Sequence, residues 1–147
     1  MHDQRVFFLE GFLQEIEEIK VGEHQYILVV DDDERVLFVL SQALRALEDG
    51  YRVETARNGE EALRKARAKR YDILITDIVM SGMNGVEMTE AIRELYPDTV
   101  VIWITAHSSH RFQSDSERLK VYRYLEKPIE IGEIRQVVVD AAEQVKS

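Results

Sequence analysis

The sequence contains no cysteine, only two prolines and seven glycines in 147 residues, and no long apolar run. The absence of cysteine excludes disulfide frameworks, thiolate metal sites and cysteine nucleophiles, and it fits a reducing compartment. No apolar stretch approaches the ~20 residues that a membrane-spanning helix needs. The acidic N-terminus is unlike a signal or transit peptide. We therefore expect a cytoplasmic protein.

Acidic residues outnumber basic ones. The chain carries 28 Asp and Glu against 19 Lys and Arg, which gives a formal net charge of −9. Such a surface repels phosphate backbones and anionic lipids, so we expect neither nucleic acid nor a membrane as a partner. With 45% apolar and 32% charged residues, the composition is typical of one globular domain. A protein or a cation is the expected partner.

Two hydrophobic patterns divide the chain. Residues 3–20 repeat apolar side chains at helical spacing with glutamates between them, which predicts an amphipathic N-terminal helix. Beyond it, short apolar runs predict strands at 26–30, 51–55, 73–76, 100–104 and 121–125. Amphipathic stretches predict helices at 35–47, 60–69, 86–95 and 131–145. The polar segment 108–119 has no clear pattern.

Alternating strands and helices of this kind are typical of an α/β fold with a doubly wound parallel sheet. Ligands of such folds bind at the carboxyl ends of the strands. Polar side chains follow four of the predicted strands. Each alone is explained by a helix cap, a turn or a solvated side chain, but together they predict one pocket, formed by Asp31, Asp32, Asp33, Asp77, Thr105 and Lys127.

The side chains of this predicted pocket suit one kind of chemistry. Crowded carboxylates repel one another unless a cation or a proton intervenes. Magnesium prefers oxygen ligands and keeps positions for water and phosphate. A lysine ammonium and a threonine hydroxyl can both contact an anionic oxygen. Carboxylates, Mg²⁺, lysine and hydroxyl together favour phosphoryl transfer.

Four runs carry a family resemblance: ILVVDDD at 27–33, YDILITDIVMSGMNG at 71–85, VIWITA at 101–106 and YLEKP at 124–128. In order and spacing they resemble the CheY-like receiver domain of two-component response regulators. The resemblance divides the chain into a helical extension, 1–25, and a receiver domain, 26–147. It implies a flavodoxin-like receiver fold: a doubly wound five-stranded parallel sheet of order 2-1-3-4-5, preceded here by an extra N-terminal amphipathic helix.

The resemblance also implies roles for individual residues. Asp77 resembles the phosphoacceptor, which takes a phosphoryl group from a histidine kinase or a phosphotransfer protein. Asp31 and Asp32 resemble the acidic pair that holds Mg²⁺. In that arrangement Asp32 and Asp77 are direct ligands, Asp31 acts through water, and the Val79 carbonyl completes the protein ligands. Lys127 would pair with the acyl phosphate, and a cis peptide is implied at Lys127-Pro128.

Switching is a further implication of the resemblance. Thr105 would move toward a phosphoryl oxygen and Tyr124 would rotate inward, which changes the surface of the family's fourth helix, fifth strand and fifth helix. Val79 and His107 lie two residues beyond Asp77 and Thr105, and we expect them to tune the rate of dephosphorylation. Ser81 departs from the family pattern, which usually has proline there, so we expect a more mobile loop.

The resulting expectation is a stand-alone phosphorelay signalling module with no output domain, acting on a downstream protein effector. It is not expected to be an enzyme beyond phosphotransfer to, and hydrolysis from, its own Asp77. One alternative is a small haloacid-dehalogenase-like phosphatase with Asp31 as nucleophile, although Arg35 departs from that pattern and Asp77 would have no role. Another is a receiver-like docking module that is never phosphorylated.

The N-terminal extension lies outside the resemblance. Its charged residues sum to −4, and its apolar stripe, which includes Phe8 and Phe12, needs a cover. Two expectations remain open. The helix either packs back on its own domain or forms a homodimer or partner-docking surface. A homodimer through the family's switching surface is a separate expectation.

Overall fold

The computed structural model describes residues 24–47, 50–106 and 110–146. These residues form a five-stranded parallel sheet of order β2-β1-β3-β4-β5, as predicted. The strands are β1 (Gln25–Val30), β2 (Tyr51–Ala56), β3 (Ile73–Asp77), β4 (Val100–Thr105) and β5 (Arg123–Glu126). The helical elements are α2 (Glu34–Arg45), α3 (Gly59–Ala68), α4 (Gly85–Leu95), the 3₁₀ turn η1 (His110–Phe112), α5 (Gln113–Arg118) and α6 (Ile131–Lys146).

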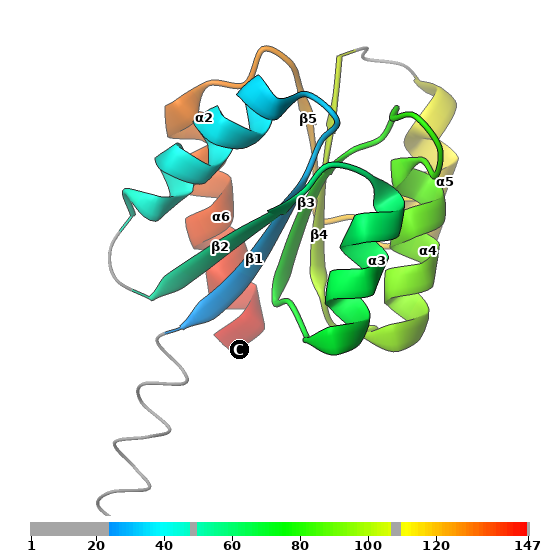
Figure 1. The fold of residues 1–147 in the computed structure, drawn as a ribbon, viewed down its shortest axis with the longest axis horizontal. Helices are drawn as coiled ribbons and strands as arrows, with labels where there is room; N and C mark the ends of the chain where they lie inside the picture. Colours follow the sequence, from blue (N-terminus) through cyan, green and yellow to red (C-terminus); the bar gives the residue numbers. More distant parts are fainter. Residues whose placement is uncertain (1–23, 48–49, 107–109, 147) are drawn as a thin grey trace, which may run out of the picture.

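Helices cover both faces of the sheet. Helices α2 and α6 lie on one face, and α3, α4 and α5 lie on the other (Figure 1). Ile27 and Val29 point into the first layer and Leu28 and Val30 into the second, and all four are buried. Because each central strand is buried on both faces, its sequence is a continuous apolar run.

The register of the sheet sets where the polar strand ends meet. Val30 at the end of β1 pairs with Thr76 of β3, so the next residue of each strand, Asp31 and Asp77, lies at the same edge. On the other side, Asp77 pairs with Ile104 of β4. The carboxyl ends of the three central strands therefore converge, which is the arrangement that the sequence predicted.

Side-chain caps begin three helices one residue before the predicted start. Asp33, Asn58 and Asn84 each accept a hydrogen bond from a backbone N–H of the first turn of α2, α3 and α4. A helix with a side-chain cap begins at the residue directly after the cap, whether this first helical residue is polar or apolar. The apolar pattern does not show this, because the first helical residues, Glu34, Gly59 and Gly85, carry no apolar side chain.

The connection between β4 and β5 differs most from the expectation. The segment without a clear pattern contains η1 and the short helix α5, and β5 begins at Arg123, two residues later than predicted. The Val121 N–H donates to the Ser116 carbonyl at 2.9 Å, and Lys120 has a φ of 55°. The chain is therefore still turning out of α5 where the apolar pattern predicts a strand.

The predicted N-terminal helix at 3–20 lies outside the described residues. Among the helices that the structure describes, none is long and apolar enough to cross a membrane.

Candidate functional site

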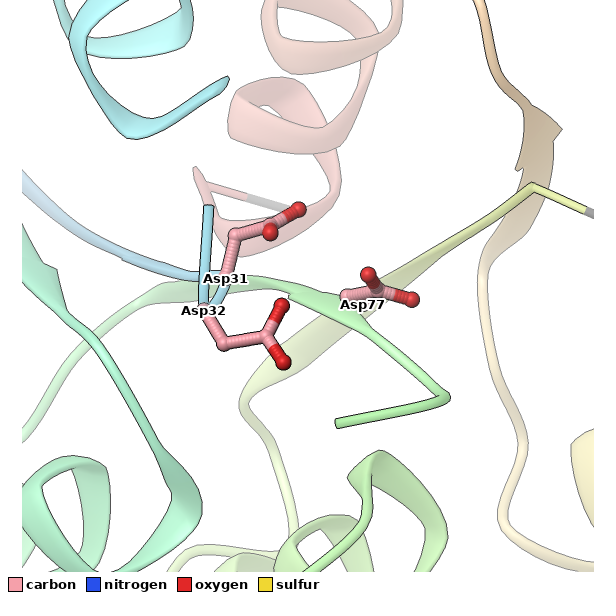
Figure 2. A group of neighbouring side chains, drawn as sticks. All are labelled: Asp31, Asp32 and Asp77. Carbon is pink, nitrogen blue, oxygen red and sulfur yellow. The ribbon is translucent and has the colours of Figure 1, made fainter. Parts of the chain in front are cut away.

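Three carboxylates meet at the carboxyl ends of β1 and β3 (Figure 2). One oxygen from each of Asp31, Asp32 and Asp77 lies within 4.8 Å of the others. Asp31 and Asp77 are buried, with 1% and 6% of their surface exposed, whereas Asp32 is exposed. Two carboxylates of the cluster are therefore buried in the core, and the cluster is accessible to solvent at Asp32.

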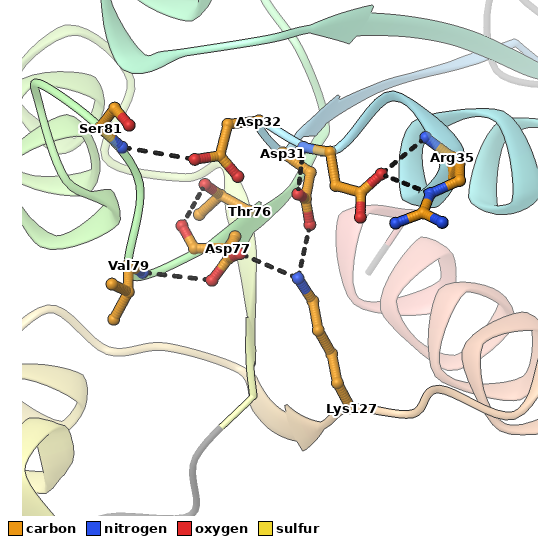
Figure 3. Close-up of polar contacts among 9 residues, drawn as sticks. Asp31, Asp32, Arg35, Thr76, Asp77, Val79, Ser81 and Lys127 are labelled. Atoms are coloured by element: carbon orange, nitrogen blue, oxygen red, sulfur yellow. Dashed lines mark hydrogen bonds and ion pairs between the residues drawn. The ribbon is translucent and has the colours of Figure 1, made fainter.

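Lys127 joins two of these carboxylates (Figure 3). Its Nζ lies 2.9 Å from Oδ2 of Asp31 and 2.9 Å from Oδ2 of Asp77. Burial raises the pKa of Asp31 above its ordinary value. Burial alone would lower the pKa of Lys127, but its hydrogen bonds to Asp77 and Asp31 outweigh burial and raise it. The ammonium is therefore held charged between its partners. The predicted cis peptide at Lys127-Pro128 is confirmed.

Backbone N–H groups donate to one oxygen of each carboxylate in the cluster. The Asp33 N–H donates to Oδ1 of Asp31 at 2.8 Å, and the Val79 N–H donates to Oδ1 of Asp77 at 3.1 Å. The Ser81 N–H donates to Oδ2 of Asp32 at 3.4 Å (Figure 3). These donors could not be predicted from the sequence, because a backbone N–H leaves no trace in side-chain patterns.

A close backbone approach shapes the loop after β3. The Gly85 N–H donates to the Ile78 carbonyl at 2.8 Å. A Cβ on Gly85 would lie 2.4 Å from the Asp77 carbonyl oxygen, so only glycine fits here. The loop folds back onto the end of β3 and aims its N–H groups at the carboxylates. The signal available in the sequence was a glycine directly after the helix cap Asn84.

The cluster fits a hard divalent cation. Within the part of the chain that the structure describes, its three carboxylates face one ammonium, that of Lys127, so the cluster keeps a net negative charge. Carboxylate oxygens are the ligands that Mg²⁺ prefers, and the exposed position of Asp32 leaves room for water and phosphate oxygens. The donor set is therefore suited to Mg²⁺.

The structure separates Asp33 from the other two aspartates of its run. The Asp33 carboxylate accepts a hydrogen bond from the Arg35 N–H at 2.9 Å and caps α2. Its carboxylate is not among the three that form the cluster. The sequence placed Asp31, Asp32 and Asp33 together after the first strand, and local cap geometry decides which of them turn inward.

Of the remaining predicted site residues, the structure describes Thr105, Val79 and Tyr124. Thr105 ends β4 and is buried, while Val79 is 57% exposed at the rim. The Tyr124 ring lies edge-on to Trp103, with centroids 6.4 Å apart, and its hydroxyl is buried without a hydrogen-bond partner in the described part of the chain. Trp103 is buried, and its Nε1 donates to Thr89 Oγ1 at 2.9 Å. His107 lies outside the described residues.

This chain is similar in sequence to known proteins over most of its length. A profile of the response regulator receiver domain matches residues 27–139. The chain is 34% identical over 119 residues to the transcriptional regulatory protein GlrR of Escherichia coli, a match that covers 81% of this chain and 26% of GlrR. It is 36% identical over 120 residues to ZraR of Klebsiella oxytoca, covering 82% of this chain and 27% of ZraR. The chain thus spans about a quarter of the length of these curated relatives.

Solved structures of other proteins share the fold of this chain. A CheY-like receiver domain protein from Methanospirillum hungatei superposes with a TM-score of 0.78 at 26% identity, over 84% of this chain and 97% of that one. The response regulator TrrA from Thermotoga maritima, in complex with Mg²⁺ and a beryllofluoride, gives a TM-score of 0.70 at 36% identity, over 80% and 98%. An acidic pocket, a receiver sheet and a matching family profile lead to one conclusion: this chain belongs to the response regulator receiver domains, the CheY-like modules of two-component signalling, rather than to the conventional enzymes.

Proposed function

We propose that this chain takes a phosphoryl group from the phosphohistidine of a histidine kinase or phosphotransfer protein onto Asp77, in a reaction that requires Mg²⁺. The observation that carries the proposal is the position of Asp77 in the acidic cluster, where Lys127 contacts it at 2.9 Å. A carboxylate with a cation site and an ammonium beside it is arranged for phosphoryl transfer, in which positioning and charge neutralisation do most of the work.

In the proposed reaction an Asp77 carboxylate oxygen attacks phosphorus. The new bond is a P–O bond, and the P–N bond to the donor imidazole breaks, with the electron pair leaving on nitrogen. Lys127 already contacts Asp77 and can contact a phosphoryl oxygen from the same place. The bound ion would be held by Asp32, Asp77 and the Val79 carbonyl, with Asp31 acting through water. It would neutralise the charge of the phosphoryl oxygens.

We extend the proposal to switching. Thr105, buried at the end of β4, would contact a phosphoryl oxygen, and Tyr124 would respond through the space behind it. The Tyr124 hydroxyl is already buried beside Trp103, without a hydrogen-bond partner in the described residues, so a new partner would stabilise it. The surface affected would be that of α5, β5 and α6, which would present the signal to a downstream protein effector.

Val79 and His107 are proposed to tune the lifetime of the phosphorylated state. Val79 exposes an apolar side chain at the rim, two residues beyond Asp77, where it would limit the approach of a hydrolytic water. Val79→Asn and His107→Ala are expected to change the rate of dephosphorylation. Unchanged rates in both variants would contradict this role.

A groove beside the cluster suits the phosphodonor. It measures about 390 Å³ and lies between α2 and the connection from β5 to α6, where Val36, Val39, Pro128 and Ile129 line it together with Lys127. On the same helix, the Phe38 side chain is 63% exposed. An apolar helix face docked here would bring its histidine close to Asp77. Of the predicted helical extension 1–25, Gln25 belongs to β1, and the part before it remains a proposed helix for packing or for a homodimer.

The two alternatives are less well supported. A phosphatase with Asp31 as nucleophile needs Asp33 beside it, but Asp33 caps α2 and Asp31 is bound to Lys127. A docking module that is never phosphorylated leaves the acidic cluster and Lys127 without a use. Neither alternative accounts for Asp77.

Intact mass after incubation with acetyl phosphate and Mg²⁺ tests the proposal. The unsubstituted chain should gain the mass of one phosphoryl group, and Asp77→Asn should gain none. Asp33→Asn is the matched control, because it keeps a good helix cap outside the cluster, and it should be modified normally. Phosphorylation of Asp77→Asn, or labelling of Asp31 with turnover of a phosphomonoester, would overturn the proposal. A chain that never responds to Mg²⁺ and beryllofluoride would instead be a docking module.

A further inference from the structure

Alternate backbone N–H groups of the loop after β3 donate to carboxylates of three different segments. The Val79 N–H donates to Asp77 at the end of β3, and the Ser81 N–H donates to Asp32 after β1. The Met83 N–H donates to Oε1 of Glu60 in the first turn of α3, at 3.3 Å. The loop is therefore held at every second residue, and its middle bond reaches the acidic cluster.

The Ser81 bond matters because Asp32 is the exposed member of the cluster. Asp31 and Asp77 are buried and are both bound to Lys127, so packing and the ammonium orient them. For Asp32, the structure records the Ser81 N–H as a donor, 49 residues away in the chain. An exposed carboxylate without such a bond rotates freely and loses that freedom when it binds a cation.

The bond leaves Asp32 able to bind a metal. A carboxylate offers about four lone-pair sites on its two oxygens, so one N–H does not block coordination. The donor is the backbone and not the serine hydroxyl, so any residue with an N–H would serve. Proline alone would not, because it lacks the N–H. Proline is also the residue that the family usually has here, so the loop can accommodate it.

We infer that Ser81 is a positioning residue, whose backbone N–H holds the Asp32 carboxylate facing the cluster and so strengthens Mg²⁺ binding. The inference rests on the proposed function for its ligand, and concerns a departure of this chain from its family. It also makes the loop between Val79 and Met83 responsive to the metal, because a change in Asp32 is passed directly to the backbone of the loop.

Titration of ¹⁵N-labelled full-length chain with MgCl₂, followed by NMR, measures the effect. Ser81→Ala keeps the N–H and should bind Mg²⁺ as the unsubstituted chain does. Ser81→Pro removes it and should bind about two- to fivefold more weakly, as expected for one solvent-exposed hydrogen bond. Equal affinity in the alanine and proline variants, or tighter binding by the proline variant, would overturn the inference.

Two metal-free measurements separate the bond from the stiffness of proline. In a double-mutant cycle of Ser81→Pro with Asp32→Ala, the two changes in unfolding free energy should not add, because they remove the same bond. Additive effects would mean that the proline acts only through rigidity and would overturn the inference. If Ser81→Pro fails to fold, the amide proton of Ser81 tests the bond in its place. Asp32→Ala should shift the resonance of this proton and speed its exchange with solvent. An unchanged resonance and exchange rate would contradict the inference.

Failure of the proposed function has a different signature. If neither the unsubstituted chain nor any variant binds Mg²⁺, the magnesium role of both the cluster and Ser81 is refuted. The metal-free double-mutant cycle then reports only whether the hydrogen bond between Ser81 and Asp32 exists. A chain that binds Mg²⁺ with the expected order of variants, yet gains no phosphoryl mass on Asp77, refutes the phosphotransfer and leaves the Ser81 inference standing.

Discussion

The ammonium nitrogen of Lys127 lies 2.9 Å from Oδ2 of Asp77, although 50 residues separate the two in the chain. The contact joins the edge strand β5, through the residue that follows it, to the central strand β3. With 22% of the Lys127 side chain exposed and 8% of the Asp77 side chain, the pair lies largely out of water. Lys127 thereby balances part of a buried negative charge and remains next to the atom proposed to react.

Replacing Lys127 should move stability and metal affinity in opposite directions. Lys127→Met leaves Asp31 and Asp77 without their ammonium, so the free energy of unfolding without metal should fall by about 1–3 kcal/mol. Mg²⁺ should bind more tightly, because a competing positive charge is gone. Urea unfolding and an Mg²⁺ titration measure the two effects. Lys120→Met, at an exposed lysine, is the control and should change neither. Weaker Mg²⁺ binding by Lys127→Met would contradict the prediction.

A methyl group at Gly85 should damage the fold next to Asp77. The added Cβ would lie 2.4 Å from the Asp77 carbonyl oxygen and 2.8 Å from Ile78 Cα, and backbone atoms cannot move aside cheaply. Gly85→Ala should therefore cost about 1–3 kcal/mol of unfolding free energy, and phosphorylation of Asp77 should slow.

Gly132 offers the matched control for this change. It lies in α6, and a Cβ there would meet nothing within 4 Å. Gly132→Ala should leave phosphorylation unchanged and stabilise the fold by up to about 1 kcal/mol, because alanine favours helix more than glycine does. Thermal unfolding of the two variants checks the contrast, and equal melting temperatures would count against it.

Arg93 is predicted to hold the end of α5 in place. Its guanidinium donates to the carbonyls of Leu119 at 2.9 Å, Lys120 at 3.1 Å and Pro97 at 3.0 Å, and also to that of Thr99. Arg93→Met would leave these carbonyls without their donor, at a cost of about 2–4 kcal/mol.

Hydrogen exchange locates the expected effect of Arg93→Met. Exchange should speed up at residues 119–122, which connect α5 to β5, and change little in β1 and β3. Arg67→Met, at an exposed position on α3, is the control and should be close to neutral. Uniform faster exchange across the sheet would show that Arg93 acts on global stability instead.

Glu54 should contribute to stability in a pH-dependent way. Its hydrogen bond to Lys69 lowers the pKa of Glu54 below the ordinary value of 4.5. A carboxyl with a lowered folded pKa stabilises the fold above its unfolded pKa, and this contribution is lost as the pH falls through the folded pKa. Glu54→Gln should therefore be less stable than the unsubstituted chain at pH 7, and the difference should shrink below about pH 4.5.

Urea unfolding across this pH range tests the Glu54 prediction. The effect should be modest, since the Glu54 side chain is 37% exposed and water screens the pair. Glu94→Gln, at an exposed position on α4, provides the control, because among the described residues no ion pair is recorded for Glu94. A difference between Glu54→Gln and the unsubstituted chain that stays constant with pH would exclude this origin.

The strands, the helices α2, α3, α4 and α6, and the cluster followed from short-range patterns, and α5 did not. Continuous apolar runs are explained by burial on both faces, so the strands were predicted within two residues. The segment that contains α5 has a six-residue helix with no buried residue, so no apolar pattern could reveal it. Its position depends on contacts such as Arg93 with Leu119, which join distant parts of the chain.

The sequence by itself determined the strand order through the family resemblance, and it determined which residue types lie at the strand ends. Only the tertiary structure decided that Asp33 turns away to cap α2 while Asp31 and Asp32 turn inward. It also decided that Ser81, where the family has proline, gives Asp32 a backbone donor. The physical reason is the same in both cases: the direction of a carboxylate is set by the N–H groups that reach it, and those come from backbone distant in sequence or from local cap geometry.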